Sequence, residues 1–217
     1  MGFTPGVLSE VGGYVLAGGR SSRMGRDKAL VELAGKPLVE HAVEKLRRVC
    51  TDVRILSANA ELEAYAPLVT DLHPGCGPLG GIEAALADSS HDWNLFLPVD
   101  VPFFPTTVLQ SWARQRIAEE SSGTRISIFT SHGMAHPALS LLHRDAEPFV
   151  AEAVRLRQLS VYFALERAGT ELAKRLGNRF VQCFAHSDIP EAQQWFLNLN
   201  TPHDLALAEA NAGALDT

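Results

Sequence analysis

The stretch that most constrains the fold of this chain is residues 16–28, where glycines and basic side chains alternate. It directly follows a short apolar run, residues 14–16, which is typical of the end of a buried strand. Glycines let the backbone adopt positive φ angles and approach a ligand closely, and successive N–H groups in such a turn form an anion-binding concavity. The glycines are Gly18, Gly19 and Gly25, and the basic residues are Arg20, Arg23, Arg26 and Lys28. We interpret the stretch as a loop that binds the phosphates of a nucleoside triphosphate.

The basic side chains of this loop are expected to have different roles. Lys28 is the best candidate for a point charge on a phosphate, whereas Arg23 can clamp phosphate oxygens with its planar fork. We expect Arg20 and Arg26 to be ordinary surface cations. The loop matches neither the Gly-x-x-x-x-Gly-Lys-Ser/Thr motif nor the Gly-x-Gly-x-x-Gly motif. The alternative interpretation is a solvated basic loop.

Short apolar runs alternate with segments of helical periodicity along the rest of the chain. The expected strands are residues 12–16, 52–57, 94–100, 125–130, 138–142 and 180–184. The expected helices are residues 37–49, 61–66, 79–87, 106–118, 146–157, 161–168 and 202–211. This alternation predicts an α/β fold, a single Rossmann-like domain whose mostly parallel sheet is covered by helices on both faces. We expect residues 1–10 to form a loose tail and residues 11–217 to form the domain.

In such a sheet, ligands bind outside the carboxyl ends of the strands, so residues that directly follow strands are site candidates. Asp100 follows the apolar segment 94–99. A carboxylate there suits Mg²⁺, a hard cation that takes oxygen ligands, waters and substrate phosphates. The alternative is the N-cap of the next helix. Because Pro102 and Pro105 place the start of that helix later in the chain, we favour the metal site.

Other polar or flexible positions follow the remaining strands of the expected sheet. Asp71 and Asn59 suit hydrogen bonds to a base edge or a ribose hydroxyl, or they are plain turn residues. Residues 77–81 open a helix whose first N–H groups favour anions, or they form only a compact strand-to-helix turn. The binding candidates in this second glycine-rich segment are Gly77, Pro78, Leu79 and Gly80.

The last part of the chain offers further candidates. Thr201 and Pro202 suit the start of a helix, as its N-cap and its first residue. Asn198 and Asn200 have no such structural need, so we expect them to face a ligand. His136, at the start of an expected strand, is a candidate for the acceptor side of the site.

Charge and composition exclude several classes of protein. The 217 residues carry a formal net charge of −6, which argues against binding to nucleic acid or to anionic membranes. The three cysteines are widely spaced and form no metal-ligand pattern, which suits a reducing cytoplasm. No apolar stretch approaches the length of a membrane-spanning helix, and the first residues lack the pattern of a signal peptide. We therefore expect a cytoplasmic protein.

In their order along the chain, these motifs resemble those of the molybdenum cofactor guanylyltransferases of the MobA type, a family of nucleotidyltransferases. The first matches are Leu-Ala-Gly-Gly at 16–19, Arg-Met-Gly at 23–25 and Asp-Lys at 27–28. The later ones are Ser-Ala-Asn at 57–59, Asp71, Gly-Pro-Leu-Gly-Gly at 77–81, Pro-Val-Asp-Val-Pro at 98–102, His-Pro at 136–137 and Asn-Leu-Asn-Thr-Pro at 198–202. The resemblance therefore covers nearly the whole chain.

This resemblance implies a fold of the nucleotide-diphospho-sugar transferase type. It also implies transfer of GMP from GTP to the molybdopterin cofactor, with release of pyrophosphate and with Mg²⁺ as cofactor. The residues that it places on GTP are Leu16, Ala17, Gly18, Lys28, Asn59 and Asp71. The resemblance also implies that Asp100 binds Mg²⁺ as well as the nucleotide. It implies that His136, Asn198 and Asn200 lie towards the pterin. Relatives that use pyrimidine nucleotides resemble Leu-Ala-Ala-Gly, so Gly19 favours a purine base.

Three alternatives stay open. A molybdopterin cytidylyltransferase or a sugar-phosphate nucleotidyltransferase would share the loop and the metal site. A non-catalytic protein that binds GTP or the cofactor would keep the loop, although Lys28 and Asp100 together argue against it. A purely structural α/β domain would leave the clustered strand-end residues unexplained. The partners expected are the two small-molecule substrates and further proteins of the cofactor pathway, including the molybdoenzyme that receives the product, and we expect a monomer or a weak oligomer.

Overall fold

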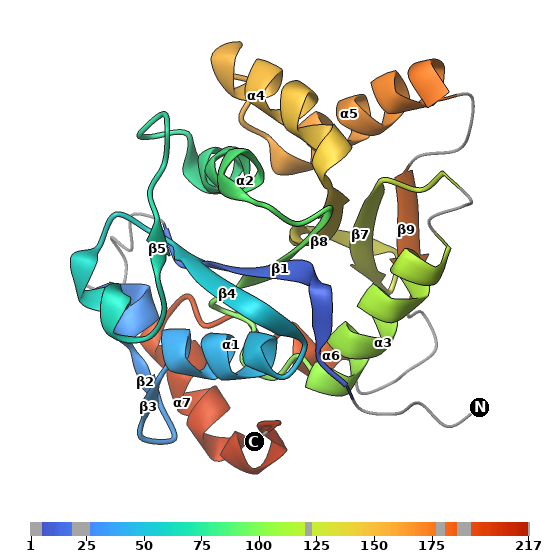
Figure 1. Cartoon of the computed structure of the whole chain (residues 1–217). Coiled ribbons are helices and arrows are strands. Elements are labelled where there is room, and N and C mark those ends of the chain that lie inside the picture. Colours follow the sequence, from blue (N-terminus) through green and yellow to red (C-terminus); the bar gives the residue numbers. More distant parts are fainter. Residues whose placement is uncertain (1–5, 19–26, 120–122, 177–180, 186–191, 217) are drawn as a thin grey trace.

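The computed structural model describes residues 6–18, 27–119, 123–176, 181–185 and 192–216. Its centre is a seven-stranded sheet in the order β5-β4-β1-β6-β8-β7-β9 (Figure 1). The strands are β1 (Leu8–Leu16), β4 (Cys50–Leu56), β5 (Leu68–Val69), β6 (Trp93–Pro98), β7 (Ile126–Ser131), β8 (Met134–His143) and β9 (Val181–Ala185). Among the described strands of this sheet, β8 runs antiparallel to both of its neighbours, whereas the other pairs are parallel. The prediction of a mostly parallel sheet is therefore confirmed.

The central strand, β1, is buried on both faces from Val11 to Leu16. It pairs with β4 on one side and with β6 on the other. Because side chains alternate along a strand, Val11 and Val15 enter one core cluster, whereas Tyr14 and Leu16 enter the other. The Tyr14 ring stacks on that of Phe96 in β6, with centroids 5.4 Å apart. Burial on both faces explains why this strand is apolar without a polar alternation.

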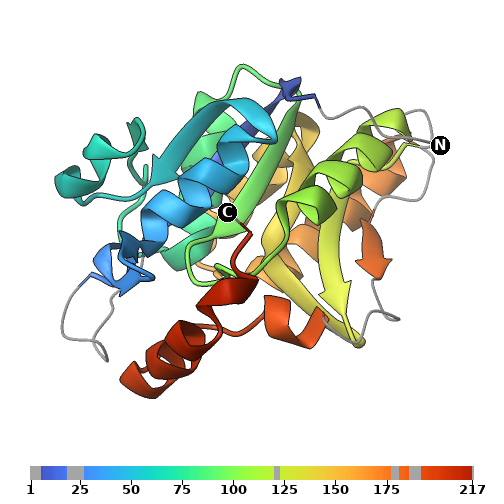
Figure 2. The same cartoon turned by 90° about the horizontal axis from the view of Figure 1, so that it is seen from below.

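Helices cover both faces of the sheet, as Figures 1 and 2 show from different sides. They are α1 (Leu38–Arg47), α2 (Gly77–Asp88), α3 (Thr106–Ala118), α4 (Glu147–Arg155), α5 (Val161–Leu176), α6 (Ala192–Trp195) and α7 (Pro202–Ala210). Buried apolar side chains of α1 and α3 belong to one core cluster, and those of α2, α4 and α5 belong to the other. In the ranges that the structure describes, no helix is long and apolar enough to cross a membrane.

A short hairpin and several 3₁₀ helices accompany these elements. Strands β2 (Glu32–Leu33) and β3 (Lys36–Pro37) form the hairpin. Its two loop residues, Ala34 and Gly35, have φ angles of 52° and 75°, as a type I′ turn requires. The 3₁₀ helix η1 (Lys28–Leu30) lies at the end of the glycine-rich stretch, and η2 (Ala60–Ala64) lies where a helix was predicted. Two more, η4 (Arg144–Ala146) and η5 (Ala212–Ala214), follow later in the chain.

Several boundaries differ from the prediction. β1 begins at Leu8, so the expected tail through Glu10 is wrong for its last residues, which belong to the sheet. The register with β4 shifts between Leu8 and Gly12, and the exposed residues at this irregularity break the apolar run that the prediction followed. α5 continues to Leu176, well beyond the expected end at residue 168. β5 was not predicted, because two residues carry no detectable period.

Candidate active site

The carboxyl ends of β4, β1 and β6 lie at one edge of the sheet, because the three strands are parallel and in register. Leu16, the last residue of β1, pairs with Leu56 of β4 and with Pro98 of β6. The chain passes from β1 to β4 on one side and later enters β6 on the other, so the strand order reverses at β1. Ligands of open α/β sheets bind at such a reversal. The residues that follow these strands therefore meet at one place.

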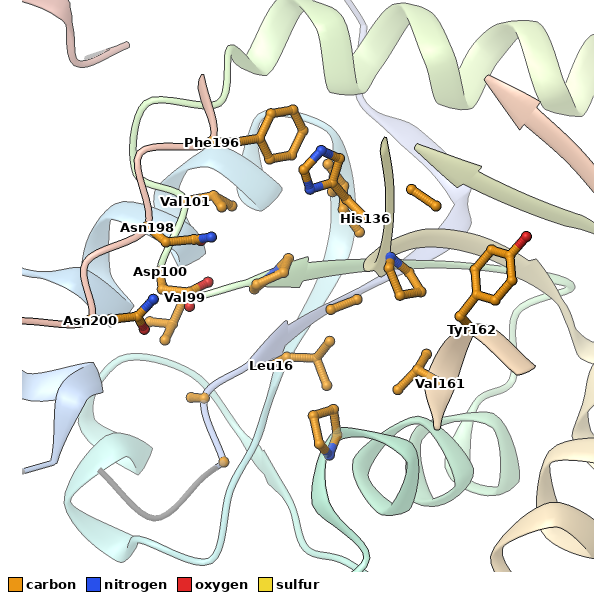
Figure 3. A pocket seen from close by; sticks show the side chains of 18 of the residues that line it. Leu16, Val99, Asp100, Val101, His136, Val161, Tyr162, Phe196, Asn198 and Asn200 are labelled. Carbon is orange, nitrogen blue, oxygen red and sulfur yellow. The ribbon is translucent and has the colours of Figure 1, made fainter. Parts of the chain in front are cut away.

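Two cavities open at this edge of the sheet. The β4-side cavity has a volume of about 830 Å³, and the β8-side cavity, seen in Figure 3, has a volume of about 810 Å³. Both volumes lie in the range of small-molecule sites. The residues that line both cavities are Leu16, Ala17, Gly18 and Pro78. The cavities therefore adjoin at the end of β1, where two ligands would meet.

Asn59 and Asp27 are joined by a hydrogen bond in the wall of the β4-side cavity. The Asn59 Nδ2 donates to Asp27 Oδ2 over 2.7 Å, while its Oδ1 accepts from the N–H of Glu61 and caps η2. The Oδ1 of Asp27 accepts from the N–H of Ala29 and caps η1, whose first residue is Lys28. Sequence reasoning gave Asp27 no role, although Asp is a preferred N-cap. Asp27 fixes the backbone that carries Lys28.

Asp71 lies before α2 and lines the β4-side cavity. Burial, and secondly the neighbouring Glu83 carboxylate, raise the pKa of Asp71 above its usual value. Glu83 is itself buried, and its Oε2 lies 2.9 Å from the Nδ1 of His73. A hydrogen-bond donor on a bound base or ribose would favour the charged form of Asp71. Asp71 is therefore placed to accept a hydrogen bond from a ligand.

In the first turn of α2, some residues line the cavities and others pack tightly against their neighbours. Gly77 lines the β4-side cavity with a φ of +61°, which L side chains rarely adopt, and Pro78 lines both cavities. Two further predicted binding residues line neither cavity. Leu79 is fully buried in the core, and a Cβ on Gly80 would lie 2.9 Å from the Cβ of Cys76. The glycine at position 80 therefore serves close packing at the start of the helix.

Lys28 binds two side chains in the β8-side cavity, next to the residues that both cavities share. Its Nζ donates to Asp100 Oδ2 over 2.8 Å and to Asn200 Oδ1 over 2.6 Å. The Lys28 and Asp100 side chains are 17% and 28% exposed, so their ion pair is half-buried. Asp100 is not a helix cap, because Pro105 precedes α3 as its N-cap. Figure 3 shows Asp100 beside Asn200 at one end of the cavity.

His136 and Phe196 form an aromatic wall of the β8-side cavity (Figure 3). Their rings stack with centroids 3.5 Å apart and an interplanar angle of 11°. A hydrogen bond of 2.8 Å joins His136 Nε2 to the hydroxyl of Ser131. Burial lowers the pKa of His136, so the imidazole is uncharged at neutral pH. Phe196 also packs edge-on against Phe104, with centroids 5.6 Å apart, so a flat and fixed surface faces the cavity.

Other lining residues of this cavity were not singled out from the sequence. Leu159 and Ser160 lie between α4 and α5, and Val161 and Tyr162 begin α5 (Figure 3). Helix α5 was predicted, but its apolar periodicity does not reveal that its first turn lines a cavity formed with distant segments of the chain. Phe196 was also missed, because one aromatic residue in an irregular segment matches no pattern.

The structure brings most of the predicted site residues together. Gly19 and Arg23 lie outside the described residues. The predicted residues that line one or both cavities are Leu16, Ala17, Gly18, Lys28, Asn59, Asp71, Gly77, Pro78, Asp100, His136, Asn198 and Asn200. In the described ranges, no group of three or more His, Cys, Asp or Glu side chains is placed to hold a metal ion. A metal at Asp100 would therefore take its other ligands largely from water and substrate.

The fold and the site together define a nucleotide-binding α/β protein with room for a second ligand beside the nucleotide. The model of the MobA-like NTP transferase domain matches residues 13–172. The molybdenum cofactor guanylyltransferase of Serratia proteamaculans is 33% identical over 202 residues, covering 90% of this chain and 92% of that protein. That of Rhizobium johnstonii is 37% identical over 212 residues, covering 93% of this chain and 92% of that protein.

The structural comparison agrees with these relatives. The crystal structure of molybdopterin-guanine dinucleotide biosynthesis protein A from Archaeoglobus fulgidus matches with a TM-score of 0.74 and 24% identity, over 94% of this chain and 99% of that one. This match shows a common fold. The chain therefore belongs to the MobA-like NTP transferase family, together with the molybdenum cofactor guanylyltransferases to which it is similar over nearly its whole length.

Proposed function

We infer that the protein is a molybdenum cofactor guanylyltransferase, which transfers GMP from GTP to the molybdopterin cofactor and releases pyrophosphate. Besides family membership, the observation that carries this inference is the Lys28–Asp100 pair beside the junction of the two cavities. The pair offers a cation for phosphate and a carboxylate for a metal where two ligands would meet.

The β4-side cavity is assigned to GTP. Asp71 accepts a hydrogen bond from the base or the ribose, and Asn59 holds the wall of the cavity through Asp27. The triphosphate extends over the backbone of Ala17 and Gly18 towards Lys28. The cation and the backbone N–H groups stabilise negative charge on the phosphates.

Mg²⁺ fits the donor set at Asp100. A single carboxylate beside a phosphate site is the usual protein contribution for this cation, which keeps waters and takes substrate phosphates as further ligands. When bound, the cation neutralises charge on the triphosphate. Asp100 would hold it, with Asn200 as a neighbouring amide oxygen.

The reaction is a displacement at the α-phosphorus of GTP. An oxygen of the acceptor's terminal phosphate forms the new P–O bond, and the bond to pyrophosphate breaks as pyrophosphate leaves. Such chemistry depends on positioning and on stabilising spread negative charge. A phosphate monoester is largely ionised near neutral pH, so no protein base or nucleophile is required. The chain contributes Lys28, the loop backbone and Arg23, whose planar fork can clamp phosphate oxygens.

The β8-side cavity is assigned to the molybdopterin acceptor. A flat heterocycle suits the stacked, uncharged rings of His136 and Phe196, since offset and edge contacts between π systems stabilise a bound ring. Tyr162 closes the far side of the cavity, and Asn198 offers an amide that can donate and accept. The apolar and aromatic wall supports a pterin rather than a sugar phosphate as the acceptor.

We also propose a biological setting for this reaction. We place the reaction in the cytoplasm, with a monomer or a weak oligomer that delivers its product to molybdoenzymes or to other proteins of the cofactor pathway. The net charge of −6 argues against nucleic acid and anionic membranes as partners.

Replacement of Asp100 tests the proposal directly. The wild-type protein should release pyrophosphate only when GTP, Mg²⁺ and molybdopterin are all present. Asp100→Ala should lower this turnover by at least about 100-fold, in line with the loss of one transition-state ligand, while isothermal titration still detects GTP binding. Asp92→Ala, at an exposed carboxylate of the same region of the chain, is the matched control. Unchanged turnover in Asp100→Ala would refute the role of this carboxylate.

A further inference from the structure

The ammonium group of Lys28 donates hydrogen bonds to two side chains from different segments of the chain, Asp100 and Asn200. We propose that Lys28 is a resident counter-ion, which keeps divalent cations off Asp100 until the triphosphate of a nucleotide draws the ammonium away. This inference rests on the metal role that the proposed function gives to Asp100. It adds that metal binding depends on the nucleotide, and it assigns Asn200 as the residue that positions Lys28 on Asp100.

Lys28 and a divalent cation would compete for Asp100. The ammonium lies 2.8 Å from Asp100 Oδ2 in half-buried surroundings, where an ion pair is stronger than at an exposed surface. A divalent cation that arrives alone must displace this ammonium or accept its repulsion at close range. In the described ranges, no cluster of acidic or histidine side chains offers further ligands as compensation. The free protein is therefore poorly suited to retain the cation.

The hydrogen bond to Asn200 keeps the Lys28 ammonium in this position. Asn200 Oδ1 accepts from Lys28 over 2.6 Å, and this second hydrogen bond holds the long, flexible lysine stem on Asp100. The backbone of Asn200 is fixed in turn, because its N–H donates to Asp204 Oδ2 and the N–H of Leu199 donates to the carbonyl of Asp100. Asn200 therefore acts through Lys28.

A bound nucleotide would draw the Lys28 ammonium from Asp100 to its phosphates. Lys28 begins η1 directly after the glycine-rich loop, and the Asp27 cap fixes its backbone, so only the side chain has to move. A triphosphate offers more negative charge and more acceptor oxygens than one carboxylate does. When the ammonium turns to the phosphates, Asp100 is freed as a ligand at the moment when phosphate oxygens become available to the same cation.

Titration of the nucleotide-free protein with Mn²⁺, followed by the electron paramagnetic resonance signal of free Mn²⁺, tests this inference. We expect Lys28→Met to bind Mn²⁺ at least tenfold more tightly than the wild type. Lys28→Arg, which keeps the charge, should behave as the wild type does. Asn200→Ala should have a Mn²⁺ affinity between those of the wild type and Lys28→Met, because it removes one of the two hydrogen bonds that hold the Lys28 ammonium. Adding Asp100→Asn to Lys28→Met should abolish the gain.

The outcomes separate this inference from the proposed function. Equal Mn²⁺ affinity of the wild type and Lys28→Met, including no binding by either, overturns the counter-ion role. Thermal denaturation checks that the variants are folded, and Lys28→Gln is the second charge-free variant if Lys28→Met is not. The titration contains neither nucleotide nor acceptor, so its result is independent of whether GMP transfer is observed.

Discussion

His136 shows how one partly buried side chain serves the acceptor cavity through its charge state. Its pKa is lowered by burial, and the ring is fixed between Phe196 and the hydroxyl of Ser131. A protonated imidazole in this place would lose solvation and present a charge to the cavity. The uncharged ring instead offers a flat surface, which is the property that the proposed acceptor requires.

The lowered pKa of His136 predicts how stability depends on pH. The folded pKa lies below the unfolded value of about 6.5, so the unfolded chain binds the proton first as the pH falls. The free energy of unfolding should therefore decrease as the pH falls through this window. In His136→Phe, which keeps a flat ring, the decrease between pH 7.5 and pH 5.5 should be smaller, as measured by urea denaturation. An equal decrease in both proteins would show that the fold does not lower the pKa of His136.

At the scale of elements, the first turn of α2 has to approach the end of β4 and the Asp71 segment closely. A Cβ on Gly80 would lie 2.9 Å from the Cβ of Cys76 and 3.4 Å from Asp71 Oδ2. The helix start and the carboxylate of the nucleotide cavity are therefore packed against the same glycine. This packing explains why Gly80 belongs to the site without lining a cavity.

Substitution of Gly80 by alanine tests this packing. Alanine favours a helix by about 1 kcal/mol over glycine, but overpacking costs about 1–3 kcal/mol. We expect Gly80→Ala to lower the free energy of unfolding by about 1 kcal/mol and to weaken GTP binding several-fold, as measured by urea denaturation and calorimetry. Gly213→Ala, where the new Cβ meets nothing within 4 Å, is the control and should neither lower the free energy of unfolding nor weaken GTP binding. A stabilised Gly80→Ala would contradict the close contact.

Across the whole molecule, the sequence predicts those features well whose signal lies within a single helix, strand or loop. The glycine-rich stretch after β1, the acid after β6 and the helix entry at Thr201 are local signals, and the capping box at Thr201 is observed. The wall at Leu159 to Tyr162 and the stack of Phe196 on His136 could not be predicted, because both depend on distant segments that only the fold brings together. The Lys28–Asn200 bond spans 172 positions and left no local signal either.

In the proposed function, one protein joins GMP to molybdopterin across two adjoining cavities. The most direct measurement is incubation with molybdopterin, Mg²⁺ and either GTP or CTP, followed by mass spectrometry of the cofactor product. We predict molybdopterin guanine dinucleotide with GTP, one pyrophosphate for each dinucleotide formed, and little or no product with CTP. A cytosine dinucleotide formed from CTP, without turnover of GTP, would contradict the account.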